Sequence, residues 1–190
     1  NHDVLMGKLA TRIADARVLG LIRRYLTAGT MAEGVVLARH EGTPQGGPLS
    51  PLLANVLLDT VDKELERRGH CFVRYADDCN VYVRSQRAAE RVMEGLVALY
   101  ARLKLRVNVT KSAVALARTR SFLGYSFWVA AGGVIKRRVA PKALSTLRAR
   151  IRAMTARSGG RSLRHVVAAL RIYLTGWKAY FQLADTPIEL

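Results

Sequence analysis

The sequence predicts an α+β fold, in which an antiparallel sheet with packed helices is followed by a region made of helices alone. Strand-type and helix-type patterns alternate from the N-terminus to about Val139, whereas only helical patterns follow Ala140–Pro141. About half of the 190 residues are hydrophobic, which is enough for one or two cores. We therefore divide the chain into residues 1–139 and a helical part, residues 140–190, which can continue beyond Leu190.

Residues 1–27 open the chain with a helical spacing of apolar residues that is interrupted near Asp15. Asp3 precedes a short apolar run, which makes it a candidate N-cap of the first helix. A short run of branched residues, Val35–Leu37, predicts one strand.

Glycine and proline are concentrated in residues 42–52, immediately before a helical pattern. Ser50 and Pro51 fit the N-cap and the first position of this helix, and Gly69 fits the residue just past its end. A glycine-rich turn that leads into a helix N-terminus is a natural place for a phosphate or the edge of a nucleotide. An ordinary loop before a helix is the alternative interpretation.

Two adjacent carboxylates, Asp77 and Asp78, lie between the β-type runs Cys71–Arg74 and Cys79–Arg84. The two runs predict a hairpin with the acidic pair at its tip. Two like charges side by side repel each other, and a hard ion such as Mg²⁺, which binds carboxylate oxygens together with substrate phosphates, would stabilise them. A solvated turn is the alternative interpretation.

The middle of the chain predicts another helix and another hairpin. Gln86–Leu103 has a helical pattern, and Ser121–Trp128 with Val134–Val139 predict a hairpin around Gly132–Gly133. The helical side chains that we expect to face inward are Ala89, Val92, Met93, Leu96, Val97 and Tyr100.

Two helices are expected in the C-terminal part, separated by a break at Ser158–Gly160. The first covers Pro141–Arg157, and the second starts after Ser162, which is a suitable N-cap. The apolar positions of the first helix are Leu144, Leu147, Ile151 and Met154. Those expected to face a core in the second are Leu163, Val166, Val167, Leu170, Leu174, Trp177 and Phe181.

Positive charge is concentrated in the C-terminal half of the chain. The formal net charge is +17, and residues 95–184 contain eighteen Lys and Arg but no Asp or Glu. Solvated surfaces normally mix both signs, so this stretch favours a polyanionic partner that binds with strong salt dependence. Five basic residues recur at helical spacing, and for them we favour nucleic-acid contact over solvation: Arg148, Arg152, Arg164, Arg171 and Lys178.

The sequence also predicts the compartment and the state of the cysteines. No segment has the pattern of a membrane span or a secretory signal, so we expect a cytoplasmic protein without a membrane partner. Cys71 and Cys79 do not form a Cys-x-x-Cys pair, and a reducing compartment favours free thiols.

Pro44–Gly46, followed about thirty residues later by Tyr75–Asp78, resembles the palm of reverse transcriptases. The longer run Gly42–Asn55 resembles most closely the bacterial proteins that group II introns encode. Three further segments resemble, in that family's order, its lysine motif, its primer grip and its helical thumb, also called the maturase domain: Asn108–Ser112, Phe122–Phe127 and Leu174–Phe181. Residues 1–139 would thus be part of the palm, and residues 140–190 the thumb.

The resemblance implies an RNA-directed DNA polymerase, a nucleotidyltransferase that adds deoxynucleotides to a DNA primer on an RNA template. It also implies binding of the intron RNA and assistance in splicing. Asp77, Asp78 and Lys111 would be catalytic, and the two aspartates would bind two Mg²⁺ ions, or Mn²⁺ in their place. The implied nucleotide and template contacts are Pro44, Gln45, Gly46 and Tyr75, and the implied primer grip is Phe122, Leu123 and Gly124.

Members of this family carry a third palm carboxylate and the fingers upstream of the segment that resembles Asn1–Met6. We therefore expect this chain by itself to be inactive as a polymerase. Two alternatives stay open. One is an RNA-binding maturase without polymerase activity, against which the intact Tyr75–Asp78 motif argues. The other is a related bacterial reverse transcriptase that acts in phage defence or is linked to CRISPR.

Overall fold

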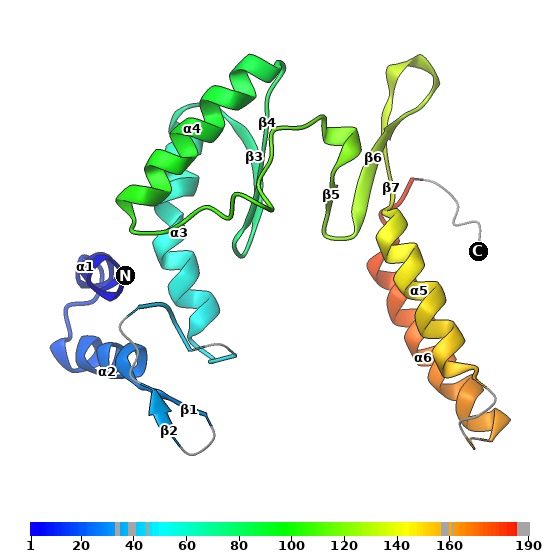
Figure 1. The fold of residues 1–190 in the computed structure, drawn as a ribbon, viewed down its shortest axis with the longest axis horizontal. Coiled ribbons are helices and arrows are strands. Elements are labelled where there is room, and N and C mark those ends of the chain that lie inside the picture. The colour runs from blue at the N-terminus through cyan, green and yellow to red at the C-terminus, as the bar shows by residue number, and fades with distance from the viewer. Residues whose placement is uncertain (33–34, 38–40, 45, 157–159, 161, 186–190) are drawn as a thin grey trace. The chain divides into compact units, whose positions relative to one another are not determined.

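The computed structural model describes residues 1–32, 35–37, 41–44, 46–156, 160 and 162–185 (Figure 1). The chain forms two compact units, Asn1–Val114 and Ala115–Leu190. Each unit contains helices together with antiparallel strands, which confirms the α+β class. The division after Val114 places the second group of strands with the C-terminal helices. The functional division between residues 1–139 and 140–190 stays a prediction.

The first unit begins with two helices, α1 (His2–Ala10) and α2 (Ala16–Thr27), and the predicted interruption near Asp15 is confirmed. Asp15 caps α2, since its Oδ1 accepts hydrogen bonds from the amides at the start of that helix. The assignment of Asp3 as N-cap was wrong. Asn1 caps α1, with its Oδ1 2.9 Å from the Asp3 nitrogen, and Asp3 lies in the first turn, where an acid favours the helix dipole.

A small hairpin follows, formed by β1 (Thr30–Ala32) and β2 (Val35–Leu37). The strand predicted at Val35–Leu37 is confirmed. Its partner β1 was not predicted, because three residues of mixed type carry no alternating pattern.

Helix α3 (Ser50–Arg67) is the central element of the first unit. Ser50 is not its N-cap as predicted; Leu49 holds that position, and the Ser50 hydroxyl instead donates to the Pro44 carbonyl oxygen at 2.6 Å. The predicted role of Gly69 is confirmed. It has φ +69, and the amides of Gly69 and His70 donate to carbonyls of the last helical turn in the hydrogen-bond pattern of a Schellman motif.

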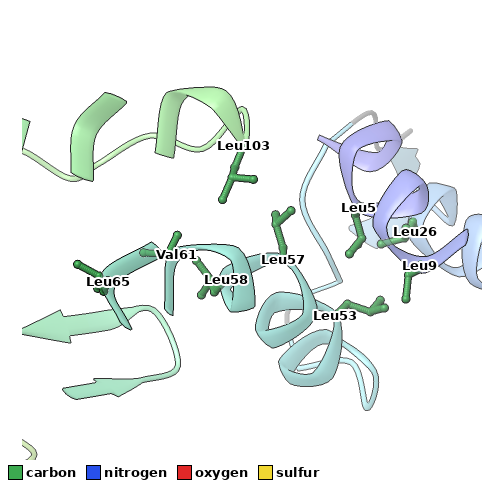
Figure 2. Close-up of a cluster of buried hydrophobic side chains, with 9 residues drawn as sticks. All are labelled: Leu5, Leu9, Leu26, Leu53, Leu57, Leu58, Val61, Leu65 and Leu103. Carbon is green, nitrogen blue, oxygen red and sulfur yellow. The ribbon is translucent and has the colours of Figure 1, made fainter. Parts of the chain in front are cut away.

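One face of α3 carries the hydrophobic core of this unit (Figure 2). The helix spacing brings several leucines and a valine onto one stripe. Figure 2 shows side chains of α1 and α2 gathered beside the N-terminal part of that stripe, and Leu103 approaching it further along. The buried members are Leu5, Leu9, Leu26, Leu53, Leu57, Leu58, Val61, Leu65 and Leu103.

The predicted acidic hairpin is formed by β3 (Cys71–Tyr75) and β4 (Asp78–Tyr82), and α4 (Gln86–Arg102) follows it as predicted. Helix α3 contacts β3, α4 contacts β4, and the two helices contact each other (Figure 1). Val97 was predicted to face inward and is instead 46% exposed. Leu99 packs against the core, since it lies on the same helical face as Leu96 and Leu103.

The second unit begins with a three-stranded antiparallel sheet in the order β5 (Ser121–Phe122), β6 (Tyr125–Val129) and β7 (Ile135–Val139). A short 3₁₀ turn, η1 (Ala117–Thr119), precedes the sheet. A second one, η2 (Ala131–Gly133), connects β6 with β7. The hairpin predicted around Gly132–Gly133 is confirmed. Its first arm, however, is two strands and not one, because the chain folds back at Leu123–Gly124.

Helices α5 (Pro141–Met154) and α6 (Leu163–Tyr180) complete the second unit and contact each other. Ser162 caps α6 as predicted, and Leu147 is 1% exposed. Three residues that were expected to face a core are instead exposed: Leu163, Val167 and Leu174. The contact with α5 covers only a stripe of α6, so apolar residues outside that stripe remain at the surface. Among the described helices, none is both long and apolar enough to cross a membrane.

Candidate active site and nucleic-acid interface

The acidic turn, defined as Tyr75–Asp78, closes the hairpin of β3 and β4. Tyr75 pairs with Asp78 at the last rung, so Ala76 and Asp77 form a two-residue connection. Ala76 has φ +53, an uncommon conformation for a residue other than glycine. Both carboxylates are exposed, and so is Tyr75.

The acidic turn offers oxygen ligands of the kind that Mg²⁺ binds. Two adjacent carboxylates suit a hard ion that completes its coordination with waters and substrate phosphates. Within the described ranges, no cluster of three or more His, Cys, Asp or Glu could hold a metal ion. The oxygen atoms of Asp77 and Asp78 suit a divalent ion, and as two residues they would supply only part of its ligands.

Arg74 connects the acidic turn to α3, and sequence reasoning did not identify it. Its guanidinium makes an ion pair with Asp62, with Nη2 2.5 Å from Oδ2 and Nε 2.8 Å from Oδ1. Its Nη1 donates to Asn55 Oδ1 and to the Ala76 carbonyl oxygen, both at 2.8 Å. The signal in the sequence was an arginine at a strand position whose neighbours Phe72 and Cys79 face the core.

The surroundings of Arg74 raise its own pKa and those of its neighbours Cys79 and Tyr100, which favours a charged guanidinium beside a neutral thiol and a neutral phenol. Hydrogen bonding to Asp62 raises the pKa of Arg74. Burial raises the pKa of the Cys79 thiol, and burial likewise raises the pKa of Tyr100 to about 12. Cys71 and Cys79 are free thiols, as predicted.

The glycine-rich loop, residues 42–50 with residue 45 outside the described part, is bonded to α1 through a backbone carbonyl and to α2 through the Ser50 side chain. His2 Nε2 donates to the Gly42 carbonyl oxygen at 2.7 Å, and His2 is buried. Tyr25 Oη lies 3.1 Å from the Ser50 hydroxyl, which in turn bonds the Pro44 carbonyl. A Cβ atom on Gly47 would lie 1.9 Å from Tyr25 Oη, so the close approach requires glycine at this position.

The structure describes three of the four residues predicted to contact nucleotide and template. Pro44 is half-buried, whereas Gly46, with φ +75, and Tyr75 are exposed. Gln45 lies outside the described residues. The nucleotide contacts of all four stay a prediction.

Lys111 lies in a loop that Asn108 organises. Asn108 Oδ1 accepts hydrogen bonds from the Thr110 and Lys111 amides, both at 3.2 Å, and from the Thr110 hydroxyl at 2.7 Å. Such an Asx turn fixes the backbone and leaves the long Lys111 side chain at the surface. The role of Lys111 toward a nucleotide stays a prediction.

The predicted primer grip consists of Phe122, the last residue of β5, and of Leu123–Gly124, the tight turn between β5 and β6. Leu123 has φ +49 and Gly124 has φ +79. The end of α6 supports this turn, since Tyr180 Oη donates to the Leu123 carbonyl at 3.0 Å and Tyr125 Oη donates to the Tyr180 carbonyl at 2.5 Å. A Cβ atom on Gly124 would lie 3.0 Å from the buried Phe181 ring. The predicted packing role of Phe181 is therefore confirmed.

The basic residues of α5 and α6 form an exposed set that we call the basic helices. All five predicted residues are exposed, and none makes an ion pair with a described residue. Unpaired cations at a surface are available for phosphate contacts. The residues are Arg148 and Arg152 on α5 and Arg164, Arg171 and Lys178 on α6.

Comparison with protein families gives two matches that follow one another along the chain. The family described as "Reverse transcriptase (RNA-dependent DNA polymerase)" matches residues 1–127. The family described as "Group II intron, maturase-specific domain" matches residues 144–187. Together the two families imply nucleic-acid partners, and reverse transcriptases in general use divalent metal ions.

Curated relatives include proteins associated with introns. Protein YkfC of Escherichia coli K12 is 29% identical over 149 residues, which cover 60% of this chain and 39% of that protein. The group II intron-encoded protein LtrA of Lactococcus lactis is 41% identical over 63 residues, covering 33% of this chain and 10% of LtrA. An uncharacterised 91 kDa protein in the cob intron of Schizosaccharomyces pombe is 42% identical over 65 residues, covering 34% of this chain and 8% of that protein. The chain thus spans well under half the length of these relatives.

Proposed function

Because this chain belongs to the reverse transcriptase family and carries a group II intron maturase domain match, we propose that the protein copies RNA into DNA for a group II intron. We propose in addition that it binds the intron RNA and assists its splicing. The observation that carries the proposal is the acidic turn, in which two exposed carboxylates lie at a hairpin tip whose Ala76 carbonyl accepts a hydrogen bond from Arg74. An exposed acidic pair with a fixed backbone supports metal binding better than it supports a solvated turn.

In the proposed reaction, the primer 3′-hydroxyl attacks the α-phosphate of a deoxynucleotide. A new P–O bond forms to the primer, the bond between the α- and β-phosphates breaks, and pyrophosphate leaves. Asp77 and Asp78 would hold Mg²⁺, which when bound stabilises charge on the attacking and leaving oxygens. Lys111 is our candidate for the group that donates a proton to the leaving pyrophosphate.

Two backbone elements have proposed positioning roles. The glycine-rich loop would lie against the nascent base pair and template, and its carbonyls are already held by His2 and Ser50. The turn at Phe122–Gly124 would support the primer end, and its bonds to the end of α6 support this role. Preorganised backbone lowers the cost of orienting two reacting groups.

The basic helices are proposed to contact phosphates of the RNA. Residues 95–184 carry eighteen positive side chains and no acid, so attraction to a polyanion extends over the whole stretch. The match to the maturase-specific domain at residues 144–187 supports intron RNA as the partner.

Primer extension by the full-length protein on an RNA template tests the proposed polymerase. We expect Mg²⁺-dependent synthesis that Asp77→Ala abolishes while RNA affinity stays near that of the unmodified protein. Asp59→Asn is the matched control, because Asp59 is an exposed acid that pairs with Lys63 on α3. Synthesis that survives in the Asp77→Ala variant would exclude Asp77 as a metal ligand.

A maturase without polymerase activity is the second candidate, and the acid-free basic stretch favours it independently of the acidic turn. The two candidates are distinguished by the same assay. A protein that binds intron RNA and promotes splicing, but that gives no extension with Mg²⁺ or Mn²⁺, would be a maturase alone.

A further inference from the structure

Arg74 has no role in the reaction proposed above, yet its side chain makes an extended set of hydrogen bonds beside the acidic turn. Its guanidinium reaches three separate groups: the Asp62 carboxylate, the Asn55 side chain and the Ala76 carbonyl. The first two belong to α3 and the third belongs to the acidic turn. The Arg74 side chain is 12% exposed. Its bonds to Asp62 are partly buried, whereas its bonds to Asn55 and to the Ala76 carbonyl lie at the surface.

Helix α3, which carries two of the three groups that Arg74 bonds, is itself held in place by the core. Asn55 and Asp62 are seven residues apart, which is close to two helical turns, and therefore lie on one face. A different face of α3 is buried in the core, where Val61 is fully buried. A displacement of the acidic turn relative to α3 would thus have to break bonds made to an element that is fixed elsewhere.

We propose that Arg74 is a positioning residue for the metal-binding carboxylates, acting through the Ala76 carbonyl oxygen. The inference rests on the proposed function, because it assigns Arg74 a role in presenting Asp77 and Asp78 to the metal ions. It adds Asn55 and Asp62 as the groups that orient the guanidinium.

The geometry of the turn shows why such a residue is needed. Ala76 has φ +53, and left-handed backbone at a residue other than glycine persists only where surrounding contacts determine it. The two carboxylates that follow also repel each other when no cation is bound. The bond from Arg74 Nη1 to the Ala76 carbonyl holds the turn in its conformation before any ion arrives.

Arginine is suited to this role in a way that lysine is not. The guanidinium has donors in a fixed fork, so it can bond both Asp62 oxygens, Asn55 and Ala76 at once. A lysine could keep the charge pairing with Asp62 but could not reach all of these acceptors together. The Arg74→Lys variant therefore keeps the ion pair with Asp62 but loses the hydrogen bond to the Ala76 carbonyl, so the effects of the two can be measured separately.

The test compares Arg74→Lys, Arg74→Gln and Asn55→Ala in the full-length protein. Arg67→Lys is the matched control, because Arg67 pairs with Glu64 on the surface of α3 and its side chain is 69% exposed. The first readout is hydrogen–deuterium exchange of peptides that cover residues 71–82, measured without metal or substrate. The second is the Mg²⁺ dependence of primer extension, with the thermal midpoint measured on the same samples.

For Arg74→Lys we expect faster exchange at residues 75–78, a thermal midpoint near that of the unmodified protein, and a loss of kcat of about 10–100-fold with a higher Mg²⁺ requirement. Arg74→Gln should show the same changes more strongly, and Asn55→Ala a smaller one. Arg67→Lys should show none of them.

Two results would overturn the inference while leaving the proposed function intact. One is normal exchange at residues 75–78 in Arg74→Lys together with normal synthesis and Mg²⁺ dependence. The other is a loss of synthesis that only follows the folded fraction, with an unchanged Mg²⁺ requirement, since this is what a purely structural ion pair gives. Failure of the proposed function is seen separately, as the absence of primer extension by the unmodified full-length protein, and failure of the assigned metal ligand as synthesis that is unaffected by Asp77→Ala.

Discussion

The acidic turn and the basic helices both carry exposed charge, but the two regions hold that charge in different ways. The backbone of the acidic turn is fixed by Arg74, whose side chain is itself bonded to α3. The side chains of the basic helices make no ion pair with any residue in the described parts of the chain. Metal-dependent chemistry depends on ligands held at fixed positions, whereas phosphate binding depends mainly on the number of charges.

The largest effect that tests this comparison should come from removing charge on α6. We expect Arg164→Gln, Arg171→Gln and Lys178→Gln together to weaken RNA binding on the order of a hundredfold at 0.15 M salt. The same variant should reduce the slope of log affinity against log salt by about 2–3, because each lost phosphate contact removes about 0.7–0.9 from that slope. Filter binding over a salt series measures both quantities.

A charge-matched control sharpens the result. Lys63→Gln, Arg67→Gln and Arg68→Gln together remove the same formal charge from α3 and its C-cap, but these residues are paired with Asp59 and Glu64. We expect a much smaller change in the salt slope. Equal slopes for the two triple variants would mean that net charge, and not the location of the basic helices, sets RNA affinity.

The next effect concerns placement of the glycine-rich loop. Gly47→Ala should lower the free energy of unfolding by about 1–3 kcal/mol, because the new methyl group would overlap Tyr25 Oη. Adding Tyr25→Phe should recover part of the loss, since the closest atom is then removed. Chemical denaturation measures both variants. Gly20→Ala is the control, as open space surrounds that glycine within α2, and an unchanged or higher stability is expected there.

A comparable test in the second unit uses two glycines with the same backbone requirement. Gly124 has φ +79 and Gly132 has φ +76, but only Gly124 faces the Phe181 ring. Both alanine variants should lose about 1 kcal/mol from the left-handed backbone. Gly124→Ala should lose more, from contact with Phe181. Equal losses in thermal or denaturant unfolding would show that the ring adjusts freely.

The smallest effect is expected from an exposed ion pair. Hydrogen bonds from the Arg137 side chain and amide lower the pKa of Asp185 to about 2 from its ordinary value of 3.8. The folded-state pKa is the lower one, so the stabilisation is present above pH 4 and is lost as the pH falls toward 2. Unfolding measured from pH 5 to pH 2 should therefore depend less on pH in Asp185→Asn. Parallel curves for the variant and the unmodified protein would contradict this.

Patterns with a short repeat allowed much of the fold to be predicted from the sequence. The acidic hairpin, the Gly69 helix end and the Ser162 cap each depend on neighbouring residues only, and all three are confirmed. The exposure of Leu163 and Val167 was not predictable, because periodicity shows which residues share a face but not whether another element covers it.

The supports of the candidate site could not be predicted for a related reason. Arg74 reaches Asn55, nineteen residues away, and His2 reaches Gly42, forty residues away. Hydrogen bonds between distant residues leave no local repeat in a sequence. The motifs marked the acidic turn and the glycine-rich loop, and only the structure identified what holds them.

The bonds between the Leu123–Gly124 turn and the end of α6 bear on the order in which the chain is made. Tyr125 and Leu123 are synthesised more than fifty residues before Tyr180, to which both are bonded. The ribosome must therefore release nearly the whole second unit before this turn gains its support. A shortened chain that ends after Val129 but before Tyr180 will carry the strands β5 and β6 but lack both the Tyr180 hydroxyl and the Phe181 ring that support their connection.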